Sequence, residues 1–199
     1  MSRLTPLLHD RLEPEQRALL ETIIGGKRGD GRDLEGFLDA RGAMRGPFNA
    51  LLHRPDLGHT LLRVGEQLRF EGRLPTLCRE IAILVVAAHF RARYEWWAHA
   101  RIAHGEGLPQ SVIDAIAAGA DPALDKDDER TVYAYTTEMM ELGRVSERTH
   151  QSAAAVFGEA VLVELVVLLG YYATISLLLN AFQVVLPPGQ STPFDDDGE

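Results

Sequence analysis

The sequence has very little cysteine: its 199 residues include one, Cys78. A single thiol excludes an intramolecular disulfide and any redox centre built from two cysteines of one chain. Basic tracts are also missing. The net charge is −9 and the arginines are scattered among acidic residues, so we expect no nucleic-acid partner.

The alternation of apolar and polar residues that is typical of β-strands and hairpins is absent as well. No signal peptide is visible, because residues 1–16 are charged throughout and contain no apolar segment. We therefore expect a cytoplasmic protein. Arginine outnumbers lysine 18 to 2, which is associated with GC-rich bacterial genomes.

Helical periodicity runs along most of the chain, and we predict an all-α fold of about eight helices. Residues 1–45 are expected to form an extension with one helix and a Gly-rich loop, and residues 46–188 the main domain. We interpret the loop, Gly25–Gly36, as a mobile surface loop, because it lacks the preceding strand and the Gly-Lys-Ser/Thr ending of a phosphate-binding loop. Residues 189–199 are expected to be a disordered acidic tail.

One apolar run, Val161–Leu186, is long enough to cross a membrane. Glu164, Asn180 and Gln183 interrupt it, however, and strong basic flanks are missing. A helix that is apolar on all sides is also required at the centre of a domain or at a subunit interface. We favour a buried helix and expect no membrane partner.

Two helical patterns meet at Arg91-Ala92-Arg93 and carry three candidate catalytic residues, Glu80, Glu95 and His99. Glu80 lies in an apolar stripe of the first helix, where desolvation would raise the pKa of an unpaired carboxyl group into the range useful for acid–base catalysis. From spacing alone, a salt bridge from Glu80 to Arg79, Arg91 or Arg93 is the favoured explanation.

Glu95 and His99 lie four residues apart and share one helix face. A carboxylate that accepts a hydrogen bond from one ring nitrogen fixes the tautomer, which makes the histidine a competent general acid or base near neutral pH. The alternative is a surface helix pair worth about 0.2–0.5 kcal/mol.

The candidate substrate-binding residues are Trp96, His104 and Asn180, although a tryptophan in this setting is more often a core or subunit-contact residue. Glu95, His99 and His104 do not have a recognised metal-binding spacing, so we expect no metal. Cys78 aligns with Ile81 and Val85, which predicts a buried and inert thiol.

Several segments together resemble the carboxymuconolactone decarboxylase family, which belongs to the alkylhydroperoxidase D-like superfamily. The resemblance extends over about Phe48 to Pro188 and rests on Leu74-Pro75, Arg79–Leu84, Tyr94–His99, Gly105–Leu108 and Val112–Ile116. The hydroperoxidase branch uses a glutamate, a Cys-x-x-Cys pair and a downstream histidine. Glu80 and His99 match the first and the last, whereas the two cysteine positions fall on Ala92 and Glu95. Without these thiols, disulfide-based peroxide reduction has no nucleophile.

The resemblance therefore implies the cysteine-free branch: an oligomeric helical fold, a homotrimer or homohexamer, with Glu80, Glu95 and His99 lining a pocket between helices. It further implies cofactor-free acid–base chemistry, such as decarboxylation, on a small carboxylated lactone or related enolisable acid in aromatic-compound catabolism. In that mechanism His99 or a neutral Glu80 reprotonates a dienolate-like anion, and Glu95 orients His99. The alternatives are an alkylhydroperoxidase-like antioxidant protein, including a residual peroxidase that uses Cys78, and a non-catalytic helical oligomer that binds a small ligand.

Overall fold

The protein was analysed as a computed structural model, in which residues 2–29 and 34–194 are described. This part of the chain contains nine α-helices and no β-sheet, only two isolated bridges, Leu8–Ala43 and Leu38–Met44. The all-α prediction is confirmed, with one helix more than the approximate number expected.

The described residues divide into two compact units. The first takes its residues from 1–72 and 178–189, and the second from 73–177 and 190–199. This division reflects which residues pack together. It does not test the boundary expected between residues 45 and 46, which stays a prediction.

The first unit contains α1 (Pro14–Gly25), α2 (Phe48–Leu52) and α3 (Pro55–Glu66), which continues as a π-helical turn, Gln67–Glu71. Its apolar core consists of Leu12, Leu19, Leu20, Ile23, Phe37, Leu38, Met44, Leu51, Leu52 and Leu62. Gly58 permits the close approach of α3 to α1 and α2, because a Cβ atom there would lie 2.5 Å from a methyl carbon of Leu19 and 3.1 Å from the carbonyl oxygen of Leu51.

The predicted mobile loop Gly25–Gly36 lies in this first unit. Its described parts include 3₁₀ turns at Lys27–Gly29 and Leu34–Phe37, and residues 30–33 lie outside the described residues. The mobility of the loop therefore stays a prediction.

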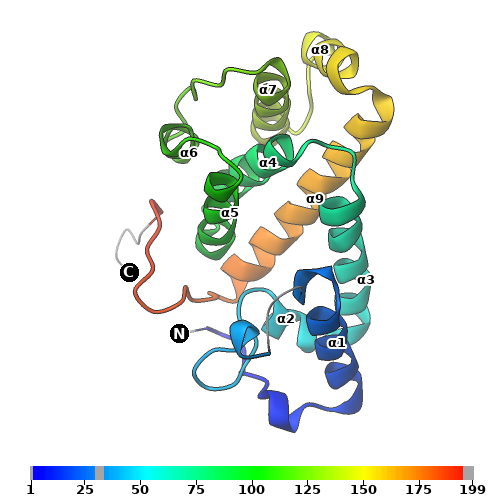
Figure 1. Ribbon diagram of the computed structural model, residues 1–199, viewed down its shortest axis with the longest axis vertical. Helices are drawn as coiled ribbons and strands as arrows, with labels where there is room; N and C mark the ends of the chain where they lie inside the picture. Colours follow the sequence, from blue (N-terminus) through cyan, green and yellow to red (C-terminus); the bar gives the residue numbers. More distant parts are fainter. Residues whose placement is uncertain (1, 30–33, 195–199) are drawn as a thin grey trace. The chain divides into compact units, whose positions relative to one another are not determined.

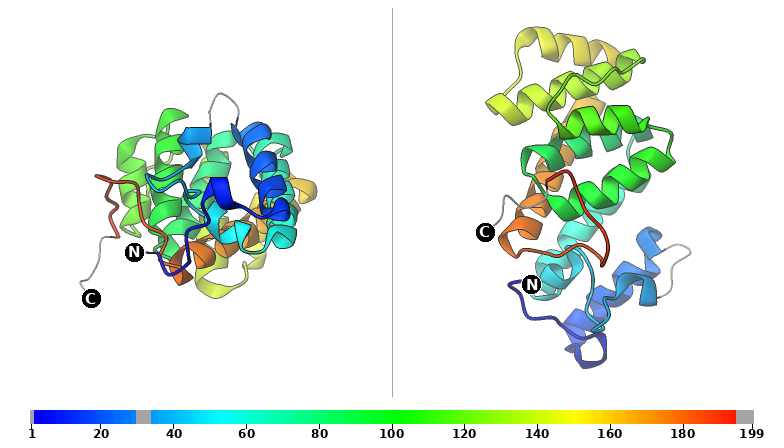
Figure 2. Two further views of the ribbon diagram at one scale, coloured as in Figure 1. Left: turned by 90° about the horizontal axis from the view of Figure 1, so that it is seen from below. Right: turned by 90° about the vertical axis from the view of Figure 1, so that its left-hand side faces the viewer.

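The second unit is built around α4 (Thr76–His89), which packs against α5 (Arg93–Gly105), α6 (Gln110–Ala117) and α7 (Asp127–Leu142) (Figures 1 and 2). Helix α8 (Glu147–Phe157) packs against α7. Every residue of α4 from Glu80 to Ala87 is buried, so this helix has no solvent-facing side over two turns. An apolar helix with neighbours on several sides is the arrangement that such burial requires.

Helix α9 (Glu159–Ala181) contains the long apolar run. By length and composition it could span a membrane, with a mean hydropathy of 2.1, but 44% of that window is buried inside the protein. The absence of a membrane partner stays a prediction. The helix ends five residues before the expected Leu186, because Gln183 adopts a left-handed conformation with φ 48° and the Val184 N–H bonds to the Leu179 carbonyl.

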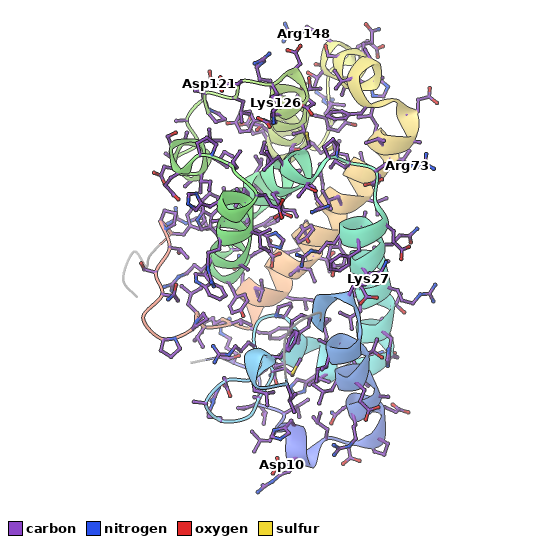
Figure 3. The ribbon with its side chains drawn as sticks, viewed as in Figure 1. Asp10, Lys27, Arg73, Asp121, Lys126 and Arg148 are labelled. Atoms are coloured by element: carbon purple, nitrogen blue, oxygen red, sulfur yellow. The ribbon has the colours of Figure 1, made fainter. Side chains whose placement is uncertain are left out.

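The carboxylate in the apolar run, Glu164, has a structural partner in the second unit. It accepts hydrogen bonds of 2.9–3.0 Å from the backbone N–H groups of Arg73 and Leu74, which precede α4 (Arg73 is labelled in Figure 3). These N–H groups lie ahead of the helix and have no carbonyl partner within it. Glu164 thus joins the loop before α4 to α9.

Replacing this carboxylate should destabilise the protein. We expect Glu164→Ala to lower the free energy of unfolding by about 1–2 kcal/mol, because backbone donors in a partly buried loop lose their acceptor. Urea unfolding followed by circular dichroism measures the change. Glu141→Ala removes an exposed carboxylate of α7 and should stay within about 0.5 kcal/mol of the wild type. Equal effects in the two variants would contradict the role assigned to Glu164.

Candidate functional site

A tight turn places α5 against α4. Arg91 takes the left-handed conformation, with φ 48°, and the Ala92 N–H donates to the Ala87 carbonyl over 2.8 Å. Ala92 is fully buried in this turn, where a larger side chain would meet the packed interior. The turn makes α4 and α5 a helical hairpin, so residues on either side of it face one another.

Glu80 and His99 meet across this hairpin. Glu80 is 0% exposed, and its Oε2 atom lies 2.6 Å from Nδ1 of His99, whose own exposure is 4%. A distance this short is typical of a hydrogen bond with at least one ionised partner. The carboxylate of the first helix is therefore a direct partner of the histidine of the second.

Glu95 contacts the other ring nitrogen. Its Oε1 atom lies 3.1 Å from Nε2 of His99, one helical turn along α5, and Glu95 is itself 5% exposed. The structure thus brings the three predicted catalytic residues together in a buried array, Glu80–His99–Glu95, with one carboxylate at each ring nitrogen. The surface-pair interpretation of Glu95 and His99 is wrong, since both side chains are buried.

Arg79 extends the array at its α4 end. Its Nε atom lies 3.3 Å from Oε1 of Glu80, and its side chain is 13% exposed. From the sequence, Glu80 is interpreted either as the partner of a salt bridge to Arg79 or as a catalytic residue. In the structure its Oε1 atom contacts Arg79 and its Oε2 atom contacts His99.

The array favours the protonated form of His99. Burial lowers the pKa of His99, but the charge of Glu80 and hydrogen bonds to Glu80 and Glu95 outweigh it, so the pKa is raised above its ordinary value. A neutral imidazole has one N–H and cannot donate to two carboxylates, whereas an imidazolium donates to both. The geometry and the direction of the pKa shift therefore agree.

Aromatic rings pack around the array. The Tyr172 ring of α9 meets the His99 ring edge-on, with centroids 5.0 Å apart. Trp96, buried on α5, packs in the same way against Phe194 at 5.1 Å. The Tyr172 ring restricts the plane of the imidazole, and the Trp96–Phe194 pair packs beside Glu95 on the neighbouring position of α5. Neither Tyr172 nor Phe194 was predicted, because no local spacing relates them to His99.

The three candidate substrate-binding residues differ in burial and belong to different parts of the chain. Trp96 lies on α5 one turn from His99, His104 is exposed near the end of α5, and Asn180 is exposed and belongs to the first unit. Their binding role stays a prediction.

The expected disordered tail has a described part in which Thr192 and Phe194 are buried, and residues 195–199 lie outside the described residues.

Neither a metal centre nor a reactive thiol is found beside the array. Among the described residues no group of three histidine, cysteine, aspartate or glutamate side chains is arranged to hold a metal ion. Cys78 is buried, and burial together with the nearby Asp128 carboxylate raises its pKa to about 12. A thiol with this pKa is almost entirely protonated at neutral pH and is a poor nucleophile.

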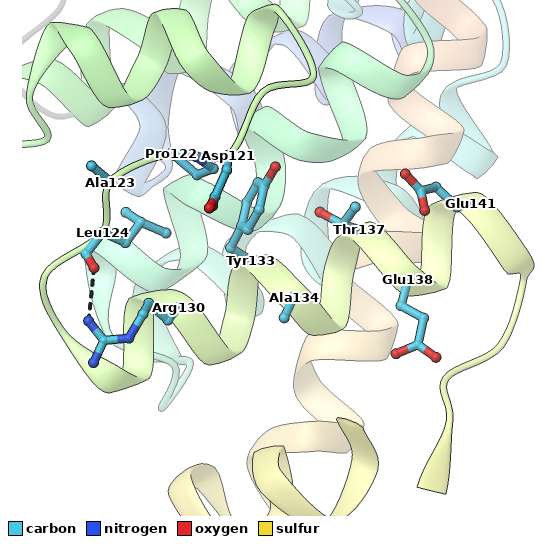
Figure 4. Close-up of a pocket in the computed structure, with 10 residues that line it drawn as sticks. All are labelled: Asp121, Pro122, Ala123, Leu124, Arg130, Tyr133, Ala134, Thr137, Glu138 and Glu141. Atoms are coloured by element: carbon cyan, nitrogen blue, oxygen red, sulfur yellow. Dashed lines mark hydrogen bonds between the residues drawn. The ribbon is translucent and has the colours of Figure 1, made fainter. Parts of the chain in front are cut away.

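A separate pocket of about 500 Å³ lies along α7 and the loop before it (Figure 4). None of the array residues lines it. Its Arg130 guanidinium is already bonded to the Leu124 and Asp125 carbonyl groups, and Glu138 accepts from the Ser146 N–H. These two polar side chains therefore serve the local fold, and the pocket is distinct from the candidate site.

Residues 55–138, which include α4, α5 and the whole array, match the model of the carboxymuconolactone decarboxylase family. Solved structures with AhpD-like folds agree with the match. Over these residues the chain is similar to that family, and its fold is AhpD-like. No curated protein matches the chain at a significant level.

The similar solved structures share the fold at low sequence identity. An AhpD-core, peroxidase-related protein from Ralstonia eutropha JMP134 is 15% identical, with a TM-score of 0.73 over 94% of this chain and 93% of that one. A peroxidase-related protein from Silicibacter sp. TM1040 is 16% identical, with a TM-score of 0.67 over 92% and 91% of the two chains. A cysteine-to-alanine variant of the debrominase Bmp8, in complex with 2,3,4-tribromopyrrole, is 13% identical, with a TM-score of 0.68 over 94% and 95%.

The chain differs at two positions from the Cys-x-x-Cys pattern that the resemblance would imply for a hydroperoxidase. The first cysteine position is Ala92, buried in the α4–α5 turn, and the second is Glu95, in contact with His99. A carboxylate therefore contacts His99 from the position at which the hydroperoxidase pattern has a cysteine.

The raised pKa of His99 predicts a specific dependence of stability on pH. A raised pKa in the folded state stabilises the protein fully below the unfolded value of 6.5, and the contribution is lost as pH rises through the folded value. We expect the difference in unfolding free energy between wild type and His99→Gln to shrink steadily above pH 6.5. Urea titrations at a series of pH values from 6 to 9 measure it, and a difference that is constant or grows with pH would contradict a raised pKa.

Proposed function

We propose that the protein is a cofactor-free acid–base enzyme of the bacterial cytoplasm, acting on a small carboxylated lactone or related enolisable acid in aromatic-compound catabolism. The reaction proposed is decarboxylation. The observation that carries the proposal is the buried histidine with a carboxylate at each ring nitrogen, because this array holds a transferable proton at a defined atom.

The geometry supports different roles for the two carboxylates. Glu80 is the more deeply buried and makes the shorter contact, so the proposal gives it the task of orienting the ring through Nδ1. Glu95 makes the longer contact, to Nε2, which is the weaker of the two and the easier to exchange for a substrate atom. This assignment reverses the expectation from the resemblance, in which Glu95 orients His99.

The proton balance of the proposed reaction follows from this assignment. The bond between the substrate carbon and its carboxylate breaks, the electron pair stays on the substrate as a dienolate-like anion, and CO₂ leaves. Nε2–H of His99 donates its proton to the carbanionic carbon, and His99 regains a proton from solvent. Arginine is a suitable group to neutralise the substrate carboxylate during binding, as is the imidazolium itself.

A thiol-based peroxidase is the less supported alternative. It requires a thiolate, and the one cysteine of the chain is buried with a pKa of about 12. Ala92 and Glu95 occupy the positions at which the hydroperoxidase pattern has cysteines. The similar structures named as peroxidase-related therefore support the fold, and acid–base chemistry fits this chain's side chains better.

The proposal predicts large losses of turnover in two variants. With 4-carboxymuconolactone as substrate, His99→Ala and Glu80→Gln should each lower kcat by at least about 10², the usual scale for lost acid–base catalysis. Release of CO₂ from the purified protein measures the rate.

Matched surface variants distinguish an effect on the array from a general effect of removing a histidine or a glutamate. His150→Ala on α8 and Glu106→Gln after α5 remove the same kinds of group from exposed positions and should leave kcat unchanged. Near-wild-type turnover in both array variants would rule out the catalytic assignment. A ligand that binds with unchanged affinity to these variants, without turnover in the wild type, would favour the non-catalytic binding protein.

We also propose that the protein forms a homotrimer or homohexamer through α9. Four large apolar side chains, Val163, Val166, Val167 and Leu177, are exposed on this helix at spacings that place them along one side. The exposed side chains form an apolar strip in which Gly170 and Thr174 lie between Val167 and Leu177. Exposed apolar surface of this kind is typical of an interface between subunits. The partner proposed for the apolar strip of α9 is a second copy of the chain, because an uncharged apolar surface can be buried against the apolar surface of an identical subunit.

A charge in the strip should break the assembly. Val166→Glu is expected to convert the oligomer to a smaller species, because a carboxylate at a subunit interface lacks a partner and water. Size-exclusion chromatography with light scattering gives the mass, and Ser152→Glu on the exposed side of α8 is the matched control. A monomeric wild type, or an oligomer that survives Val166→Glu unchanged, would contradict the proposal.

A further inference from the structure

Residues 190–194 form a strap that packs along α5 next to the array (red in Figures 1 and 2). The strap contains neither helix nor strand. Its residues alternate between exposed and buried from position 191 onward, and the two buried ones, Thr192 and Phe194, are each 7% exposed. The strap and α5 belong to the same compact unit. It is therefore an irregular segment with two side chains buried in that unit.

Three side-chain contacts hold the strap on α5 and on the turn before it. At one end, the indole N–H of Trp97 donates to Oε1 of Gln190 over 2.9 Å. At the other end, the Phe194 ring packs edge-on against Trp96, with centroids 5.1 Å apart. The guanidinium carbon of Arg91, in the turn, lies 5.8 Å from the centroid of the same Phe194 ring. Both ends of the strap are thus attached to the hairpin that carries the array.

These contacts are individually weak. A neutral hydrogen bond and an edge-on ring pair each change an equilibrium by only about 2- to 12-fold, and a cation beside a ring at an exposed site by about 2- to 5-fold. Gln190 and Arg91 are both exposed, so water competes for their polar groups. A segment held in this way opens far more readily than the helices on which it lies.

The array itself is closed to solvent and to substrate. Glu80, Glu95 and His99 are each at most 5% exposed. An atom that receives a proton from Nε2 of His99 must come within about 3 Å of it or reach it through one water molecule. At least one neighbouring side chain must therefore move before the proposed reaction occurs.

Trp96 is the neighbour that the strap contacts. It lies three residues before His99, a spacing that makes the two side chains neighbours on the surface of α5. Trp96 is 4% exposed, and the Phe194 ring packs on it. In a close-packed interior an indole turns only when space opens beside it. Displacement of the Phe194 ring supplies that space.

We propose that the strap is a removable cover of the candidate site: with Phe194 in place, Trp96 is held beside His99, and with Phe194 displaced, Trp96 turns aside and the imidazole becomes accessible to small molecules. The inference rests on the proposed acid–base function for its meaning in catalysis. The opening itself is a property of the folded protein and needs no substrate.

Deuterium exchange at the histidine ring measures the opening. The C2 hydrogen of an imidazole exchanges with deuterated water only where solvent base reaches the ring. Trypsin releases His99 in residues 94–101, which contain no other histidine, so mass spectrometry of this peptide gives the rate. In Phe194→Ala we expect exchange at His99 to be at least about fivefold faster than in the wild type, because the ring pair and the buried ring surface are both lost. Phe194→Tyr keeps the ring and should exchange as the wild type does.

Two controls distinguish a local opening from general unfolding. Phe157→Ala removes a half-buried ring from α8 and should leave the exchange at His99 unchanged. The backbone amides of α4, which is buried from Glu80 to Ala87, should exchange in Phe194→Ala as they do in the wild type. Unchanged exchange at His99 in Phe194→Ala, or an equal acceleration of the α4 amides, would overturn the proposal.

Gln190→Ala gives a second variant for the case in which Phe194→Ala does not fold. Gln190 is exposed, so its loss leaves the packed interior intact. The strap then lacks the acceptor for the Trp97 indole, and exchange at His99 should rise by about two- to fivefold. Exchange as slow as in the wild type would overturn the proposal.

Turnover of 4-carboxymuconolactone gives the second measurement. If the wild type decarboxylates this substrate, kcat/KM should rise in Phe194→Ala together with the exchange at His99, and a fall would overturn the role of the strap in admitting substrate. If the wild type has no decarboxylase activity, faster exchange in Phe194→Ala supports the removable cover and contradicts only the proposed reaction. Unchanged exchange with intact catalysis contradicts only the removable cover.

Discussion

Glu80 lies inside the most enclosed helix of its unit, and a carboxylate there requires both hydrogen bonds and opposite charge. The other features of the second unit follow from this requirement. The tight turn at Arg91 brings His99 to one oxygen, and Arg79 reaches the other from the same helix. A neutral aliphatic side chain would fill the same space at lower electrostatic cost, so the carboxylate indicates a role other than packing.

Glu95 adds a second carboxylate to His99 and so affects the protonation state of the histidine. A histidine with one carboxylate partner can remain neutral, whereas a histidine between two carboxylates is driven to the imidazolium form. Arg79 adds a positive charge 3.3 Å from the second oxygen of Glu80. The four side chains therefore act as one unit, and the effect of changing any of them depends on the others.

The sequence predicts local features well and long-range contacts poorly. Proline and helical periodicity mark α1 and α3, and the four-residue spacing of Glu95 and His99 predicts their contact correctly. The contact between Glu80 and His99 depends on how α4 and α5 pack, so it followed from the family resemblance and not from spacing. Tyr172, which contacts His99, and Phe194, which contacts Trp96, come from distant parts of the chain. Helix α9 is apolar on all sides, so its sequence does not indicate that the face with Val163 and Val166 is exposed.

The fold alone does not select the chemistry in this superfamily. Proteins only 13–16% identical to this chain superpose over most of its length, and they include peroxidase-related proteins and a debrominase. At position 95 this chain has a carboxylate, which contacts the histidine from one turn away on the same helix. A thiol at that place supplies a nucleophile, whereas a carboxylate supplies only a proton acceptor and a charge.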